Sequence, residues 1–238
     1  MRPRFKLLLT VSTVLLAVLL FLFSPMFDIR DVQITGNATV PRADIYARLQ
    51  ATHSHLLLFN TVAARSRVME NLYVGGVTFV RAWPGRLYAT IHERRLVAYV
   101  EHGPGIMLFL CEEGRVLEVR ATPAAALPRV VGLPVTRFEL GEVLDVPNPE
   151  AFRLVVAYTH ALARHGLTPY ITHIDVADTS NTRILIHNLE FNVGCATDAD
   201  EKVRVIAAVL DGLPGMALYH GFFDLREIRE EYFFTILT

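Results

Sequence analysis

Residues 77–94 read VTFVRAWPGRLYATIHER, and this stretch decides the fold of the first part of the chain. Residues 77–81 and 87–91 are rich in β-branched and aromatic side chains, which favours two strands. The segment Trp83-Pro84-Gly85 between them is a turn sequence, because proline and glycine supply backbone angles that turns require. The stretch therefore predicts two consecutive strands joined by a turn.

The residues before this stretch add one strand and two helices. Residues 28–35 alternate apolar and polar side chains, as in a half-buried strand, and Gly36-Asn37 ends it. Pro41 suits the first turn of a short amphipathic helix, and residues 61–72 have the apolar spacing of a second helix. We therefore expect a β-α-α-β-β domain over residues 28–94.

From residue 95 onward strands dominate, and we expect a β-rich domain over residues 95–238. Two helices are predicted, at 149–165 and 198–210, while the five prolines between 120 and 150 indicate a loop with brief extended pieces. The whole chain is then of the α+β class, and its second domain is an antiparallel sheet with two flanking helices. The expected strands of this domain are 97–101, 107–111, 115–119, 171–176, 184–187, 191–193, 219–225 and 232–237.

The N-terminus predicts a membrane anchor. Residues 1–6 carry three basic side chains and no acid, and residues 7–27 carry no charge. A helix of that length spans ~31 Å, close to the ~30 Å hydrocarbon core of a bilayer. The alternative is a cleaved signal peptide, which has a shorter apolar region and small residues at its cleavage site. We expect a transmembrane helix at 7–27 with a cytoplasmic tail at 1–6, because the basic flank stays in the cytoplasm. Residues after 27 would then lie outside the cytoplasmic membrane.

Composition excludes several functions. Of the 238 residues, 23 are Lys or Arg and 24 are Asp or Glu, so a net charge of −1 gives no basis for general nucleic-acid binding. The two cysteines, Cys111 and Cys195, are too few for a disulfide scaffold, although they could pair with each other. No nucleotide-binding loop, nucleophile motif or metal-protease motif occurs. We predict no cofactor, no metal site and no enzymatic activity.

The chain contains a series of short motifs in a specific order: Val32-x-Ile34-x-Gly36-Asn37, Asp44-Ile45, Arg81-x-Trp83-Pro84-x-x-Leu87, Glu93-Arg94-Arg95-x-Val97-Ala98, Gly114-x-Val116, Leu127-Pro128-x-Val130-x-Gly132, Val193-Gly194, Lys202-Val203 and Asp224-Leu225-Arg226. Their order and spacing resemble the FtsQ/DivIB family of bacterial cell-division proteins. The resemblance implies a POTRA domain after the anchor and a β domain beyond it. It also implies a non-catalytic scaffold of the divisome, located at the septum. Its expected partners are FtsB/DivIC and FtsL, with other division proteins contacting the POTRA domain.

The motif residues of the first domain are expected to have structural roles. Gly36 supplies an unusual backbone angle, Trp83 packs under the sheet, and Glu93 and Arg94 pair with Arg81 or with a helix end. The residues assigned to this structural group are Gly36, Asn37, Arg81, Trp83, Pro84, Glu93 and Arg94.

The end of the chain is the expected partner-binding site. Residues 232–237 have strong strand propensity, and an edge strand there would offer unpaired backbone groups to a partner strand. The alternative is a strand internal to the sheet. Asp224 and Arg226, two apart on the preceding strand, either pair with neighbouring strands or meet a partner. The predicted partner-binding residues are Asp224, Arg226, Tyr232, Phe233, Phe234, Thr235, Ile236 and Leu237.

Two other classes of protein share some of these features. A sortase-type transpeptidase has an anchor, a β-rich exterior domain and a reactive cysteine, but Cys195 lies in Asn-Val-Gly-Cys-Ala, unlike the sortase motif. Another POTRA-bearing assembly factor would end in a membrane β-barrel, whose alternating lipid-facing strands the sequence does not show.

Overall fold

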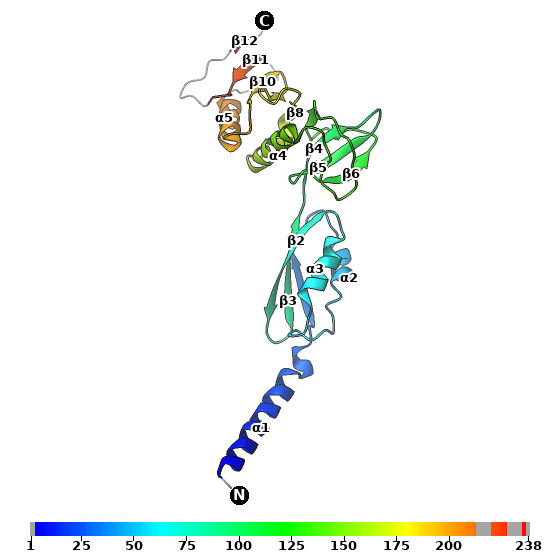
Figure 1. Ribbon diagram of the computed structural model, residues 1–238, viewed down its shortest axis with the longest axis vertical. Coiled ribbons are helices and arrows are strands. Elements are labelled where there is room, and N and C mark those ends of the chain that lie inside the picture. The colour runs from blue at the N-terminus through cyan, green and yellow to red at the C-terminus, as the bar shows by residue number, and fades with distance from the viewer. Residues whose placement is uncertain (1–2, 213–219, 228–234, 237–238) are drawn as a thin grey trace. The chain divides into compact units, whose positions relative to one another are not determined.

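The computed structural model describes residues 3–212, 220–227 and 235–236, with side chains from residue 9 to 212 and from 220 to 227 (Figure 1). It divides into two compact units, Met1–Arg94 and Arg95–Thr238. The predicted binding residues Tyr232, Phe233, Phe234 and Leu237 lie outside the described residues.

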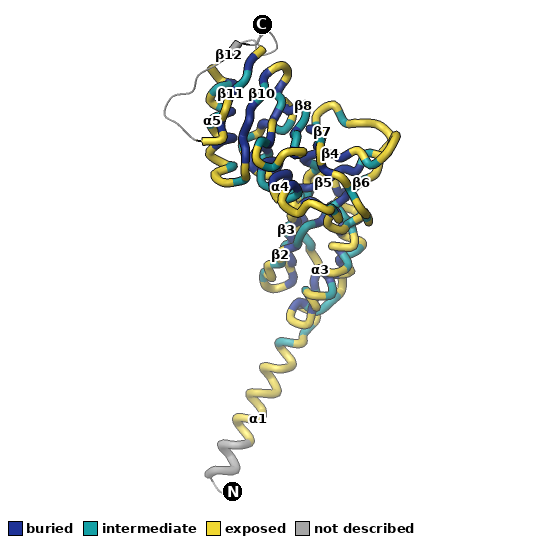
Figure 2. Tube along the Cα trace, turned by 45° about the horizontal axis from the view of Figure 1, so that its top comes forward, coloured by how far each residue is buried: buried dark blue, intermediate teal, exposed yellow. Residues whose placement is uncertain are grey.

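The first unit begins with helix α1 (Pro3–Leu22), which ends five residues earlier than predicted. Ser24 caps a short 3-10 helix, η1 (Pro25–Phe27), in which Pro25 occupies the first turn. The prediction of one helix up to residue 27 was therefore wrong at its end, because Pro25 starts a separate 3-10 helix. Phe27, at the end of that 3-10 helix, is buried within the unit. Figure 2 shows the described part of α1 exposed along its length. In the part of the chain that the structure describes, no helix has the combined length and hydropathy of a membrane span.

The rest of the first unit has the predicted β-α-α-β-β order. Its elements are β1 (Asp31–Thr35), α2 (Arg42–Leu49), α3 (Thr61–Met69), β2 (Val74–Ala82) and β3 (Arg86–Glu93). The sheet order is β1-β3-β2, with β1 parallel to β3 and β2 antiparallel to β3. Apolar side chains of the strands and both helices form one core, which includes Ile29, Ile45, Leu56, Val68, Leu87 and Ile91.

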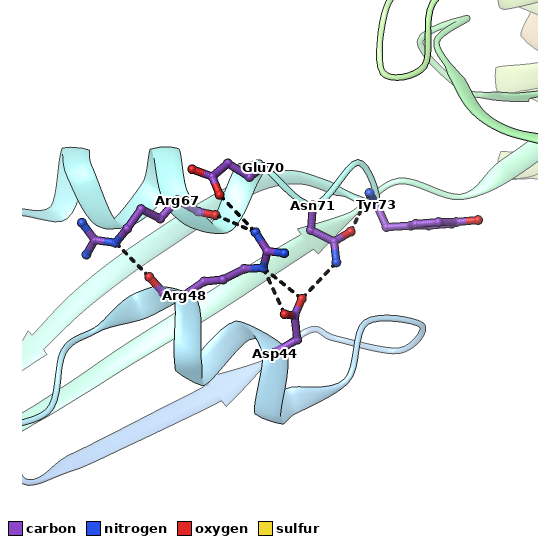
Figure 3. Close-up of polar contacts among 6 residues, drawn as sticks. All are labelled: Asp44, Arg48, Arg67, Glu70, Asn71 and Tyr73. Carbon is purple, nitrogen blue, oxygen red and sulfur yellow. Dashed lines mark hydrogen bonds and ion pairs between the residues drawn. The ribbon is translucent and has the colours of Figure 1, made fainter.

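Polar side chains join α2 to α3 at their exposed edges (Figure 3). The Arg48 guanidinium donates to the Asp44 carboxylate at 3.1 Å and to Glu70 at 3.2 Å. Arg67 donates in return to the carbonyl oxygen of Arg48 at 2.9 Å, and Asn71 donates to Asp44 at 3.2 Å. The hydrogen bonds from Asn71 and Arg48 hold the pKa of Asp44 below its usual range.

The second unit is one nine-stranded sheet with two long helices. Its strand order is β12-β11-β10-β9-β8-β7-β4-β5-β6. The helices are α4 (Pro149–Arg164), capped by Asn148, and α5 (Ala199–Gly212), and both bury an apolar face in the core of this unit. The strands are β4 (Leu96–Glu101), β5 (Met107–Cys111), β6 (Val116–Arg120), β7 (Arg129–Val131), β8 (Ile171–Asp175), β9 (Arg183–Ile186), β10 (Leu189–Asn192), β11 (Gly221–Asp224) and β12 (Thr235–Ile236), with a 3-10 turn, η2 (Thr168–Tyr170), before β8.

The sheet is mixed, so the prediction of an antiparallel sheet was wrong. Strand β7 lies between β4 and β8 and is parallel to both, and β10 is parallel to β11. Both arrangements follow from long connections, because parallel neighbours need a crossover segment rather than a short turn. Helix α4 lies between β7 and β8 in the chain, and α5 lies between β10 and β11.

Candidate partner-binding edge of the second unit

Strand β12 forms one edge of the nine-stranded sheet. It pairs antiparallel with β11, with Thr235 opposite Phe222 and Ile236 opposite Gly221. Among the described residues, no strand lies beyond it. Of the predicted strand 232–237, the structure describes Thr235 and Ile236, and it places them at a sheet edge. An edge strand presents backbone N–H and C=O groups that a further strand can use.

The strand beneath this edge is anchored in the core. Phe223 of β11 is 5% exposed and stacks on Phe191 of β10, with ring centroids 4.9 Å apart. Leu225 is fully buried, and its N–H donates to the carbonyl oxygen of Asn192 at 2.8 Å. The β11 backbone is therefore a rigid base for the edge strand.

Asp224 and Arg226 form an ion pair with each other where β11 ends. The Arg226 guanidinium donates to the Asp224 carboxylate at 2.7 Å and to the side-chain oxygen of Asn181 at 3.2 Å. Asp224 raises the pKa of Arg226, chiefly through this hydrogen bond. Arg226 lies in a bend beyond the strand, so the expected period-two placement on one strand was wrong. The two side chains therefore lie at the end of β11, where Arg226 reaches the loop before β9 through Asn181.

Sequence reasoning missed two side chains that fix the neighbouring loop. The Tyr158 hydroxyl donates to the carbonyl oxygens of Val193 (3.0 Å) and Cys195 (2.7 Å). The Lys202 ammonium donates to the same two oxygens, at 2.7 and 3.2 Å. Burial raises the pKa of Tyr158 and lowers that of Lys202, which is only 2% exposed. The sequence held two signals at Lys202, which belongs to the Lys202-Val203 motif and is the only lysine after residue 6 in a chain that otherwise uses arginine.

The loop at residues 193–195 lies against the Asp224–Arg226 ion pair. Gly194 lies between the two clamped carbonyls with φ +60, and a Cβ there would come within 3.0 Å of the Arg226 side chain. The Cys195 thiol contacts the Thr197 hydroxyl at 3.5 Å, and this hydrogen bond lowers the thiol pKa. Cys195 is exposed and Cys111 is buried in β5, and both are free thiols.

Two motif residues of the first unit serve the turn after β1. Gly36 has φ +80, and a Cβ there would lie 2.3 Å from the carbonyl oxygen of Ile91, which confirms its predicted backbone role. Asn37 donates to the carbonyl oxygen of Val40 at 3.1 Å. These contacts hold the turn against β3.

Glu93 binds the chain just before α2. Its carboxylate accepts hydrogen bonds from the backbone N–H groups of Ala38 (3.0 Å), Thr39 (2.7 Å) and Val40 (2.9 Å). Burial alone would raise the pKa of Glu93, but the three N–H donors outweigh it and hold the pKa below its usual range. The carboxylate thus ties the end of β3 to the start of α2.

The basic motif residues also contact backbone carbonyl oxygens. Arg81 donates to Phe59 at 3.0 Å. Arg94 donates to Leu72 at 3.0 Å and to Val74 at 2.9 Å, just after α3. The predicted approach of Glu93 and Arg94 to helix ends fits these contacts. Arg81 instead fastens the loop before α3.

Trp83 and Pro84 lie in the predicted turn between β2 and β3. The prediction that Trp83 packs under the sheet was wrong, because the turn carries its side chain beyond the strands. It is 55% exposed and meets Phe27 edge-on, with ring centroids 4.8 Å apart.

The fold and its motifs define an FtsQ-type POTRA-domain protein, since residues 27–94 match the family model of that description. The chain is 20% identical over 213 residues to the protein named "Cell division protein DivIB" of Clostridium botulinum strain Hall, covering 88% of this chain and 83% of the relative. The protein of the same name from the Loch Maree strain matches with the same identity and coverage. The domain match and the two relatives support the resemblance to the FtsQ/DivIB family that the motifs predicted.

Proposed function

We propose that this protein is a non-catalytic scaffold of bacterial cell division that captures an extended segment of a partner at the β12 edge. The expected partner at this edge is FtsB/DivIC, in complex with FtsL. The names of the two relatives and the FtsQ-type POTRA domain support the role in division. The observation that carries strand capture is the position of β12 at the end of the sheet order, next to β11, whose Phe223 is buried.

The chemistry of capture follows from the edge. A partner strand added to β12 would gain main-chain hydrogen bonds for affinity and side-chain pockets for specificity. The Asp224–Arg226 pair at the end of β11 is proposed to offer charges of both signs to polar groups of the partner. Tyr232, Phe233, Phe234 and Leu237, which lie outside the described residues, are further residues that we expect to contact the partner.

Two proline variants test strand capture. In an antiparallel ladder successive residues point their N–H groups to opposite sides, so one of Thr235 and Ile236 donates toward β11 and the other points outward. Proline removes the donor. The variants are Thr235→Pro and Ile236→Pro. The one that replaces the residue whose N–H points outward should lose binding to a peptide of the exterior segment of FtsB/DivIC and keep the parent's thermal stability. Its inward-facing counterpart, the matched control, should lose both. Unchanged peptide affinity in both variants would place capture elsewhere.

We further propose that α1 anchors the protein in the cytoplasmic membrane, with the tail at 1–6 inside and residues 28–238 outside. The exposed side chains of α1 are mostly large and apolar, among them Leu9, Leu15, Leu16 and Leu20. A reporter that is active only in the cytoplasm should be silent when fused after Thr238. Activity of that fusion would reject the topology.

The POTRA domain is proposed to bring the protein to the septum through other division proteins. A fluorescent fusion of the full chain should collect at mid-cell in dividing cells. Deletion of residues 28–94, with the anchor and second unit kept, should abolish that localisation. Normal mid-cell localisation of the deletion protein would reject this role.

A further inference from the structure

Exposed apolar side chains gather where α1 meets the rest of the first unit. Five of them, Phe23, Met26, Leu57, Leu58 and Trp83, are between 40% and 66% exposed, and we call this set the apolar collar. They come from three separate segments: the end of α1 with η1, the loop before α3, and the turn between β2 and β3. A soluble surface rarely gathers so many large apolar side chains without a binding role.

Hydrogen bonds hold the loop of the collar against the helix end. The Leu57 N–H donates to Nδ1 of His55 at 3.3 Å, so the other ring nitrogen carries the proton. That Nε2 donates to the carbonyl oxygen of Leu22, the last residue of α1, at 3.0 Å. The His55 ring also lies 5.7 Å from the ring of Phe23. The loop is thus fixed beside the point where α1 ends.

The turn that carries Trp83 is fixed against residues 27–30, the segment that follows α1. Phe27 is 2% exposed and meets Trp83 edge-on, while its N–H and C=O groups bond within this junction. The Arg30 N–H donates to the carbonyl oxygen of Gly85 at 2.9 Å, and a Cβ on Gly85 would lie 2.5 Å from the oxygen of Asp28. The collar is therefore a built surface on a rigid base, not a set of independent loops.

We propose that the apolar collar inserts into the interfacial layer of the lipid bilayer around the end of α1. The proposal rests on the proposed membrane anchoring of α1, because continuity with that helix would bring the collar to the bilayer surface. Tryptophan favours this layer because its ring is apolar and its N–H remains hydrated. Leu57 and Leu58 supply the apolar contact that an interfacial surface buries. Insertion would hold the POTRA domain upright on the membrane and limit the directions in which its sheet meets other proteins.

The native protein carries its own probe, because Trp83 is the only tryptophan in the chain. Full-length protein would be reconstituted in phosphatidylcholine–phosphatidylglycerol vesicles whose acyl chains are brominated near the headgroup, near the chain end, or not at all. We expect Trp83 emission to be quenched most by bromine near the headgroup. Its emission maximum should lie at a shorter wavelength than in detergent-free buffer, where acrylamide has access to Trp83. Full access of acrylamide to Trp83 on vesicles, with no bromine quenching, would overturn the proposal.

A matched control moves the probe to the far end of the same sheet. Val74 pairs with Glu93 at that end, and Ala82 pairs with Arg86 next to the turn, so eight residue steps, or ~26 Å, separate the two ends. The double variant Trp83→Phe, Tyr73→Trp should float with vesicles and show no bromine quenching. The variant Leu57→Asp, Leu58→Asp keeps Trp83 and should reduce its quenching.

Vesicle flotation separates failure of the collar from failure of the anchor. Protein that floats while Trp83 remains unquenched retains the anchor and rejects the collar. Protein that does not float rejects the anchor and the collar together. Equal quenching of the tryptophan at position 73 would mean that the whole unit sinks into lipid, which also contradicts an interfacial collar.

Discussion

Single residues in this protein act mainly on the backbone. Glu93, Arg94, Arg81 and Tyr158 bind main-chain groups of segments that are more than 20 residues away, and Lys202 binds the loop that precedes its own helix. Buried or half-buried backbone groups outside helices and strands need such partners, because leaving them unpaired costs free energy. The motif glutamate and arginines were recognisable from sequence, but their targets were not, since no local pattern states which carbonyl or N–H a long side chain will reach.

Gly36 provides a test of close packing at this scale. Gly36→Ala should lower the free energy of unfolding by about 2–4 kcal/mol, because φ +80 is strained for alanine and the Cβ would overlap the oxygen of Ile91. Gly103→Ala is the control, since Gly103 has φ +77 with no atom within 4 Å, and it should cost only about 1–2 kcal/mol. Denaturant unfolding of both variants measures the difference. Equal costs would show that the approach to Ile91 has no energetic weight.

Asp44 and Glu93 predict how the POTRA domain responds to acid. Both carboxyl groups have folded-state pKa values below their ordinary 3.8 and 4.5. Their contribution to stability is therefore complete above the unfolded pKa and is lost as pH falls through the folded pKa. We expect unfolding followed by Trp83 emission to show stability falling below about pH 4.5. The variant Asp44→Asn, Glu93→Gln should be less stable at pH 7 and have a flatter acid limb. An equally steep limb in this variant would assign the acid sensitivity to other groups.

At the scale of elements, periodicity predicted the POTRA half well. The β-branched and aromatic residues in 77–94 predicted β2, the turn and β3, and Pro41 marked the start of α2. Strand β7 was hidden in a proline-rich stretch because three residues carry no period, and its position comes from pairing with β4 and β8. The parallel pairs were missed for a related reason. Strand order depends on how the connecting segments pack rather than on the strand sequences.

The hydrogen bonds of Tyr158 and Lys202 to the 193–195 loop join α4, α5 and the sheet. They predict energetic coupling between the two helices. Tyr158→Phe and Lys202→Met should each lower the free energy of unfolding by about 1–3 kcal/mol, because each removes donors to buried carbonyl oxygens. Both side chains bind the same two oxygens, so the effects should not add. Chemical denaturation of the single and double variants measures the coupling. Additive losses would mean that the two donors act independently.

At the scale of the molecule, the proposed work is divided among three parts. In this proposal helix α1 and the apolar collar would place the protein on the membrane. The POTRA domain would bring it to other division proteins, and the β12 edge would capture an extended partner. The family relationship was recognisable from the order of short motifs along the chain. The edge position of β12 was left open by its sequence, because an apolar strand suits the interior of a sheet as well as its edge.

Hydrogen exchange of the full chain, with and without a peptide of the exterior segment of FtsB/DivIC, tests strand capture most directly. A partner strand would use the outward N–H groups of β12, so peptide binding should slow exchange at Thr235 or Ile236 and leave β6, the opposite edge of the same sheet, unchanged. Slowed exchange along β6 or along β2, with β12 exchanging as in the free protein, would contradict the account.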